Sequence, residues 1–172
     1  MATTWIATAF STKKTIKKSG GSILRLAFYL IILLFACLQL VSPLLATNLW
    51  PKNSLIYIIA DIITVLGLII MLWARKSLGK NWSANIALKE NHKLITKGPY
   101  KYVRHPIYSG LILMILGTVI YINTLAFLIF FIIFFLGAFY KARKEEELLL
   151  NHFSNKYLEY KKHTTYLIPL IF

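Results

Sequence analysis

Cysteine is almost absent from this 172-residue chain, and acidic residues are scarce. Cys37 has no second cysteine to pair with, which excludes an internal disulfide and a cysteine-based metal centre. No histidine and carboxylate pair shows metal-ligand spacing, so we expect no bound metal. Only six residues are Asp or Glu against twenty Lys and Arg, which gives a formal charge of +14. The sequence also lacks internal repeats and low-complexity linkers, which favours one domain.

Apolar residues are in excess, at 58% of the chain, and they are arranged in long blocks. The four blocks are residues 26–46, 54–74, 106–121 and 125–140. The first two have 21 residues each, enough for a helix to cross the ~30 Å hydrocarbon core of a bilayer. The last two, with 16 residues each, reach roughly 24 Å. We therefore predict an all-α integral membrane protein with about four transmembrane helices.

The basic residues predict the topology. Only Lys52 lies between the first two spans, and the other Lys and Arg lie before residue 26, in 75–105 or after 140. The positive-inside rule then places both termini in the cytosol. We expect a loosely ordered basic arm at residues 1–22, followed by one membrane domain at residues 23–172. Within that domain we expect a cytosolic loop at residues 75–105 and an amphipathic helical tail at residues 141–172. Membrane lipids explain the charge without nucleic acid.

Residues 92–110 place basic groups and tyrosines directly against the third span. Polar residues at a bilayer boundary are costly to bury, so a binding or catalytic site is favoured over an anchoring belt. Pro106 is well placed to begin the helix, since proline at the first helical position wastes no hydrogen bond. Arg104 and His105 then flank the helix N-terminus, and Tyr108 lies on the same face as Arg104.

Three of the six acidic residues form the run 145–147, after the fourth span. Such a run can be simply solvated, but it lies on the same predicted side as Arg104 and is therefore a candidate partner. Asp61 lies inside the second span, where we favour a structural or tunnel-lining role. Gly110 and Gly117, two turns apart, predict a face where another helix approaches closely.

The order of these residues resembles the isoprenylcysteine carboxyl methyltransferase family and its phospholipid methyltransferase relatives. The matching elements are His92-x-Leu94-Ile95-x-x-Gly98-Pro99-Tyr100, Arg104-His105-Pro106-x-Tyr108-x-Gly110, Glu145-Glu146, Phe153, Tyr157, Tyr160 and Ile168-Pro169. The resemblance covers about residues 79–169 and is weakly specific for substrate. Only two predicted spans precede the motif loop, which is similar to compact prokaryotic members and implies a prokaryotic inner membrane.

The resemblance implies methyl transfer from S-adenosylmethionine, bound from the cytosol, to a lipophilic acceptor. The implied cofactor-binding residues are His92, Lys93, Leu94, Ile95, Tyr100, His105, Pro106, Ile107, Tyr108 and Glu145, with Asn85 as a further contributor. The implied catalytic residues are Arg104, Lys141 and Glu146. Lys141 stands where relatives often have arginine, and lysine offers a carboxylate only a point charge. Ser154 replaces a usual glycine.

The methyl acceptor stays open. Carboxyl O-methylation of an isoprenylcysteine-like small molecule or lipidated substrate is favoured, because a carboxylate arrives ionised and Arg104 could orient it. An amine or thiol acceptor would first have to lose a proton, for example to Glu146 or His105. The alternatives are N-methylation of a phospholipid headgroup, NADPH-dependent membrane reduction and a non-catalytic membrane scaffold. The oligomeric state is not predicted.

Overall fold

The computed structural model describes residues 45–82 and 93–167, the backbone of residues 15–18 and 87–89, and the single residues Leu30 and Leu33. Most of the predicted first span, 26–46, lies outside the described residues, and so do Cys37, Asn85, His92 and Ile168-Pro169. The expected total of four spans therefore stays a prediction.

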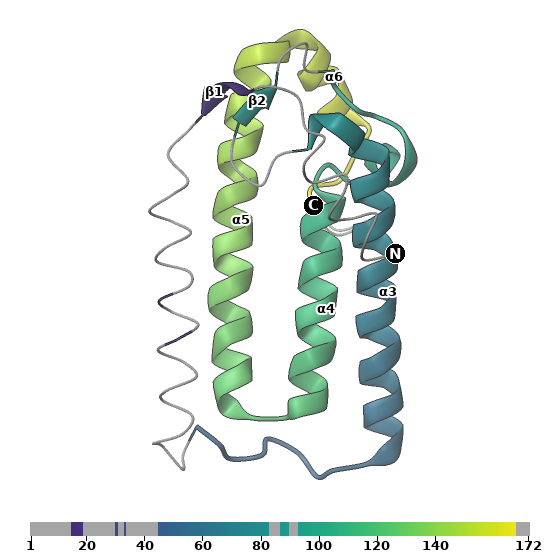
Figure 1. The fold of residues 1–172 in the computed structure, drawn as a ribbon, viewed down its shortest axis with the longest axis vertical. Coiled ribbons are helices and arrows are strands. Elements are labelled where there is room, and N and C mark those ends of the chain that lie inside the picture. The colour runs from purple at the N-terminus through teal and green to yellow at the C-terminus, as the bar shows by residue number, and fades with distance from the viewer. Residues whose placement is uncertain are drawn as a thin grey trace.

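Three long helices lie side by side (Figure 1). They are α3 (Ser54–Leu78), α4 (Pro106–Ile122) and α5 (Leu125–Phe153). Each begins at the first residue of a predicted span, and α3 and α5 continue past the apolar stretches into charged sequence. Within the described part of the chain, α3 and α5 are long and apolar enough to cross a membrane, and α4 is a shorter apolar helix.

Asn123 ties the α4–α5 connection to the segment before α3. It ends α4 in the left-handed conformation, with φ of 60°, and is 1% exposed. Its Oδ1 accepts hydrogen bonds from the backbone N–H groups of Leu49 and Trp50, each at 3.1 Å. Its Nδ2 donates to the carbonyl of Trp50 at 2.6 Å. One buried side chain thus joins three segments at this end of the bundle.

Glycines allow α3 and α4 to pack backbone against backbone. A Cβ atom on Gly110 would lie 2.6 Å from the carbonyl oxygen of Gly67, and one on Gly67 would lie 2.6 Å from that of Gly110. A Cβ atom on Gly117 would lie 2.6 Å from the carbonyl oxygen of Ala60. These separations leave no room for a side chain, so the close approach predicted at Gly110 and Gly117 is confirmed.

A two-stranded ribbon adds to the helices, which an all-α fold did not predict. The strands β1 (Thr15–Lys18) and β2 (Ala87–Lys89) pair antiparallel, with an irregular register between Thr15 and Lys17. Residues 15–18 of the expected N-terminal arm thus pair with a segment that is distant in the sequence. The ribbon lies at the same end of the bundle as α6 (Figure 1).

The tail does not continue as one helix. α5 ends at Phe153, and α6 (Asn155–Lys162) is a separate helix across the end of the bundle (Figure 1). The break is Ser154, whose φ of 45° and ψ of −118° interrupt the helical backbone. A left-handed residue is usually glycine, so the substitution noted at this position sits where the chain must turn sharply.

The residues after α6 return to the start of α4. The Thr165 N–H donates to the carbonyl of Tyr102 at 3.0 Å, and the Arg104 N–H donates to the carbonyl of Thr165 at 2.9 Å. The His105 N–H donates to the carbonyl of Tyr166 at 3.3 Å. The tail therefore runs parallel to residues 102–105, which directly follow the 3-10 turn η2 (Gly98–Lys101). A second 3-10 turn, η1 (Gly79–Asn81), follows α3.

Candidate active site

Arg104 is held at the α6 end of the bundle by two different elements. Its Nε lies 2.5 Å from Oε1 of Glu146 on α5. Its Nη1 donates to the carbonyls of Lys161, at 3.4 Å, and Thr164. The side chains of Arg104 and Glu146 are each 10% exposed, so this is a largely buried ion pair. The predicted convergence of the acidic run with Arg104 is found in the structure.

Glu146 has basic groups on both carboxylate oxygens. Besides Arg104, Oε1 lies 3.6 Å from Nε2 of His105, and Oε2 lies 3.2 Å from Nζ of Lys161. Burial alone would raise the pKa of Glu146, but the contacts with His105 and Arg104 outweigh burial and lower it to about 2. A carboxylate with so low a pKa stays ionised at neutral pH and is a poor proton acceptor.

Glu145, the preceding residue, has a different environment. Its Oε1 accepts a hydrogen bond from the Tyr108 hydroxyl at 2.7 Å, and its Oε2 lies 3.8 Å from Nδ1 of His105. Lys141, one turn earlier on α5, lies over the Tyr108 ring with its Nζ 5.5 Å from the ring centroid. Burial raises the pKa of Glu145, although His105, Lys141 and the Tyr108 hydroxyl oppose the effect. The two adjacent glutamates thus differ in the direction of their pKa shifts.

Two buried polar atoms beside these acids have no hydrogen-bond partner among the described residues. One is Nε2 of His105, whose ring lies edge-on to Tyr166 with centroids 5.3 Å apart. The other is the hydroxyl of Tyr157, a residue of α6 that is 1% exposed. Burial raises the pKa of Tyr157, and the negative charge of Glu146 adds to this effect. The site therefore keeps unused hydrogen-bonding capacity.

Tyr100 approaches the site from η2. It is buried, and its carbonyl accepts a hydrogen bond from the Tyr160 hydroxyl at 2.7 Å. Burial first, and then the charge of Glu145, raise the pKa of Tyr100. The negative charge of Glu145, whose carboxylate binds Tyr108, therefore also affects the phenol of Tyr100.

The structure unites most of the residues implied for the site. Arg104, His105, Tyr108, Lys141, Glu145 and Glu146 form one cluster, Tyr100 adjoins it, and Pro106 and Ile107 form the first turn of α4. Residues 93–95 are not united with it: Lys93 is exposed, and the segment makes no hydrogen bond or ion pair to the acids in the described structure. Asp61 is exposed near the opposite end of α3.

Sequence reasoning did not assign a site role to Tyr157, Lys161 or Tyr166. Tyr157 carried a signal, because it is one of the residues that match the family, whereas nothing distinguished Lys161 from the other basic residues of the tail. Among the described residues, no group of three or more His, Cys, Asp or Glu side chains is placed to hold a metal ion.

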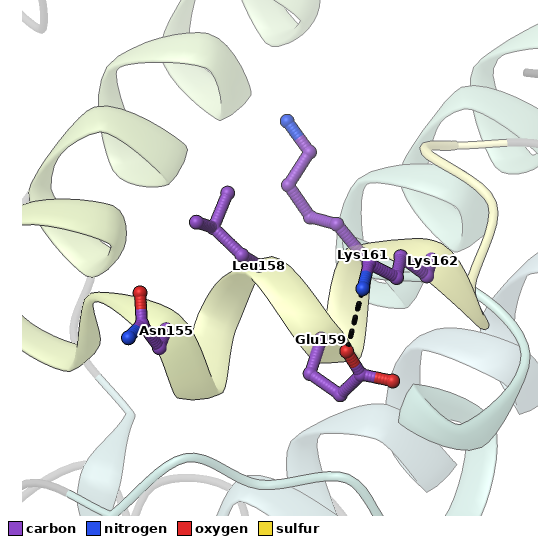
Figure 2. A pocket seen from close by; sticks show the side chains of 5 residues that line it. All are labelled: Asn155, Leu158, Glu159, Lys161 and Lys162. Atoms are coloured by element: carbon purple, nitrogen blue, oxygen red, sulfur yellow. Dashed lines mark hydrogen bonds and ion pairs between the residues drawn. The ribbon is translucent and has the colours of Figure 1, made fainter.

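A surface hollow lies next to α6. It is lined by Asn155, Leu158, Glu159, Lys161 and Lys162 (Figure 2). Glu159 pairs with Lys162 at 2.9 Å, while the Lys161 side chain extends away from both of them. Since Lys161 also reaches Glu146 at 3.2 Å, it is the residue that connects this hollow to the buried acids.

Comparison with known proteins finds related sequences. Residues 58–152 match the model of the isoprenylcysteine carboxyl methyltransferase (ICMT) family. The uncharacterised protein YpbQ of Bacillus subtilis is 32% identical over 114 residues, which cover 64% of this chain and 67% of YpbQ. The protein-S-isoprenylcysteine O-methyltransferase of Saccharomyces cerevisiae is 32% identical over 143 residues, which cover 80% of this chain and 56% of the yeast enzyme.

A solved structure is also similar. It is that of the eukaryotic intramembrane Ras methyltransferase ICMT, with a TM-score of 0.59 and 25% sequence identity. The match covers 89% of this chain and 55% of the eukaryotic one. This chain therefore spans about half the length of these two named methyltransferases. Similarity to an intramembrane protein, together with the apolar helices α3 and α5, shows that the chain is a membrane protein.

The matched segment contains the cluster described above, from Tyr100 through Glu146. It covers more than half of the chain, and both the sequence relatives and the structural neighbour point to the same group of methyltransferases. The predicted resemblance is confirmed: the chain belongs to the isoprenylcysteine carboxyl methyltransferase family.

Proposed function

We propose that this protein transfers a methyl group from S-adenosylmethionine to the carboxylate of a lipophilic acceptor of the isoprenylcysteine class. The observation that carries the proposal is that two adjacent glutamates bind different partners. Glu146 holds Arg104, a cation suited to a carboxylate, and Glu145 is bound to Tyr108 on the neighbouring helix. A carboxylate suited to a cation, Glu145, and an arginine suited to an anion, Arg104, are therefore held by consecutive residues of α5.

The Glu145 side fits a cationic cofactor. Its side chain is 25% exposed, so it is reachable, and it adjoins the aromatic residue Tyr108. A carboxylate beside an aromatic ring attracts positive groups such as a sulfonium or an ammonium. We assign cofactor binding to Tyr100, His105 to Tyr108 and Glu145, and the resemblance to the family adds residues 92–95 to this proposal. When bound, S-adenosylmethionine supplies an electrophilic methyl group on its sulfonium, and the chain positions the acceptor in line with it.

The Glu146 side favours an acceptor that arrives ionised. Because the pKa of Glu146 is about 2, this carboxylate does not take a proton from an amine or a thiol at neutral pH. A carboxylate acceptor needs no base and needs only orientation and charge stabilisation, which Arg104 provides. We therefore assign Arg104 to the acceptor and Glu146 to holding Arg104. Lys141 adds positive charge one turn from Glu145.

The distribution of charge supports one orientation in the membrane. The site lies at the end of the bundle where basic residues gather, so we propose that it faces the cytosol, as do both termini. The polar cofactor would enter from water and the apolar acceptor from the bilayer. We further propose that the four-span arrangement is completed by residues 26–46, that α6 lies at the membrane surface, and that the membrane is the inner membrane of a prokaryote.

Calorimetric titration of the detergent-purified protein with S-adenosylmethionine tests the cofactor. We expect saturable binding in the wild type, strong loss in Glu145→Ala and retention in Glu147→Ala. Glu147 is a matched control, because its side chain is 62% exposed and pairs with Lys144 at 2.9 Å outside the cluster. Binding of NADPH without binding of S-adenosylmethionine would instead indicate a reductase. Binding of neither by folded protein would favour a scaffold.

Labelled methyl transfer then tests the acceptor. N-acetyl-S-farnesylcysteine and phosphatidylethanolamine are offered in separate reactions with methyl-labelled S-adenosylmethionine. A methyl ester releases labelled methanol in alkali, whereas an N-methyl group does not. Alkali-labile product on the farnesylcysteine supports carboxyl methylation, and alkali-stable product on the phospholipid would replace it with headgroup N-methylation.

A further inference from the structure

We propose that Arg143 on α5 is a second binding residue for the carboxylate of the acceptor, and that it lies next to Arg104 on a shared tyrosine ring. In this role Arg143 receives the carboxylate at the edge of the bilayer, and Arg104 holds it during methyl transfer. The inference rests on the proposed function, because it concerns how a lipophilic acid reaches Arg104.

The Arg143 side chain lies against the end of the apolar stretch of α5. The residue itself is three positions beyond that stretch, 125–140, and it is exposed. Its guanidinium carbon lies 5.1 Å from the ring centroid of Phe139, one helical turn earlier. Side chains on a helix lean toward its N-terminus, and for α5 this direction is toward the apolar stretch. The cation of Arg143 is therefore open at the boundary between apolar and charged sequence.

The ring of Tyr166 contacts both arginines. Its centroid lies 5.5 Å from the guanidinium carbon of Arg143 and 5.4 Å from that of Arg104. Tyr166 is 7% exposed, and its hydroxyl donates to the carbonyl of Phe139 at 3.2 Å. The His105 N–H donates to the carbonyl of Tyr166 at 3.3 Å. The side chain that both arginines contact is thus held in place, and the two cations are only one ring apart.

The two arginines differ in their counter-charges. Arg104 has Glu146 at 2.5 Å, whereas Arg143 makes no ion pair or hydrogen bond in the part of the chain that the structure describes. Three lysines near the site do have glutamate partners: Lys144 with Glu147 at 2.9 Å, Lys161 with Glu146 at 3.2 Å and Lys162 with Glu159 at 2.9 Å. A cation without a counter-charge attracts an anion, most strongly where apolar surroundings limit the screening by water.

Arg143 also has the donors that a carboxylate requires. An aromatic ring attracts a guanidinium through its π face and leaves N–H groups for a carboxylate, which binds two of them along one edge. Arg104 has less to offer, because its Nε binds Glu146 and its Nη1 donates to two backbone carbonyls. Only Nη2 of Arg104 has no hydrogen bond among the described residues. A lipophilic acid therefore finds more available donors at Arg143 than at Arg104.

Kinetics of methyl transfer in an uncharged detergent, without anionic lipid, test the role of Arg143. N-acetyl-S-farnesylcysteine is the varied acceptor, and its methyl ester, which lacks the charge, serves as an inhibitor. In Arg143→Gln we expect KM for the acid to rise about five-fold, the loss of one exposed charge pair. The kcat and the inhibition constant of the ester should not change, because Arg104 and the apolar contacts remain. High salt should reduce the difference in KM from the wild type.

Two further variants serve as controls. Arg143→Lys keeps the charge and should retain most of the affinity for the acid. Lys144→Gln removes the same charge from the neighbouring residue, whose side chain is 40% exposed and lies over the Tyr140 ring at 6.0 Å. Its KM should stay close to that of the wild type, because Lys144 does not contact the ring that Arg104 and Arg143 share.

The outcomes separate this inference from the proposed function. A wild type that binds S-adenosylmethionine but does not methylate the acid overturns the carboxylate acceptor, and the role of Arg143 with it. An active wild type together with an unchanged KM in Arg143→Gln, or with an equal rise in Lys144→Gln, overturns the role of Arg143 alone. A large fall in the thermal midpoint of Arg143→Gln, or equally weakened binding of the ester, would show a structural role and overturn it as well.

A phospholipid phosphate is the competing ligand for Arg143. In that case, phosphatidylglycerol added to the detergent would stimulate the wild type and leave Arg143→Gln unaffected. Without this lipid the two proteins would have the same KM for the acid. That combination would overturn acceptor binding and assign Arg143 to contact with the membrane surface.

Discussion

Arg104 and Glu146 are 42 residues apart in the chain, and their side chains meet at 2.5 Å in a site where each is 10% exposed. Replacing Glu146 by Ala leaves Arg104 buried without its counter-charge. We expect a loss of about 3 kcal/mol in the free energy of unfolding, typical of breaking a buried pair. Thermal unfolding in detergent measures it, and Glu147→Ala should change stability by less than about 0.5 kcal/mol. Equal effects of the two substitutions would contradict a special role for this pair.

The same carboxylate predicts how stability depends on pH. The pKa of Glu146 in the folded protein is about 2, below its ordinary value of 4.5. The unfolded chain therefore binds more protons than the folded one between these values. The stabilisation is complete above pH 4.5 and is lost as pH falls toward 2. The free energy of unfolding, measured from pH 6 down to pH 3, should fall in the wild type and fall less in Glu146→Gln. The same decline in both proteins would contradict the assignment to Glu146.

Glu145 predicts a pH dependence of ligand binding instead. Its pKa is raised above 4.5, so it releases its proton later than Glu146 as pH rises. Affinity for S-adenosylmethionine should increase through that range, because only the ionised carboxylate attracts a cation. Titrations at several pH values measure the effect. His105, Lys141, Tyr108 and Tyr100 also face this carboxylate, so the series is repeated in Glu145→Gln, where the remaining dependence belongs to them.

The glycine contact between α3 and α4 predicts opposite effects for two similar substitutions. Gly110→Ala places a methyl group 2.6 Å from the carbonyl of Gly67, so we expect destabilisation of about 2–3 kcal/mol or failure to fold. Gly137→Ala on α5 meets nothing within 4 Å and removes a flexible residue from a helix. It should be neutral or stabilising by up to about 1 kcal/mol. Thermal unfolding in detergent measures the stability of both variants. A Gly110→Ala variant more stable than the Gly137→Ala variant would contradict the close packing of α3 against α4.

Ser154 predicts a stabilising substitution. Its φ of 45° is unfavourable for a residue with a side chain, and the side chain makes no capping hydrogen bond to α6. Ser154→Gly should therefore raise stability by about 1 kcal/mol, while Ser154→Ala should not. The comparison of the two thermal midpoints isolates backbone strain from loss of the hydroxyl. A lower midpoint for Ser154→Gly would show that the serine side chain contributes to the turn.

The helices could be predicted because their signals are local. The apolar blocks, Pro106 and the turn at Asn123 act within a few residues, and α3, α4 and α5 begin where these signals place them. The only sign of the break at Ser154 was the glycine usual in the family at this position, and the serine of this chain masked that sign, although the backbone there has a φ of 45°. Pairing of β1 with β2 was missed for another reason: strands this short carry no pattern of their own.

The same distinction between local and long-range signals applies to the candidate site. Arg104, His105, Tyr108, Glu145 and Glu146 were recognisable as a group, because charged residues beside apolar spans are rare and their types fit one chemistry. Their partners were not recognisable. Which glutamate binds Arg104 and which binds Tyr108 depends on the rotation of α5 against α4, and the roles of Tyr157 and Lys161 depend on the turn that folds α6 over them.

The amino-acid order was sufficient to establish a membrane protein of this family and its candidate residues, since hydrophobic length and residue type act locally. Only the tertiary structure decided that two adjacent glutamates have pKa values shifted in opposite directions. Burial and neighbouring charge set those shifts, and both depend on residues such as Arg104 and His105 that come close to the glutamates only when distant segments pack together.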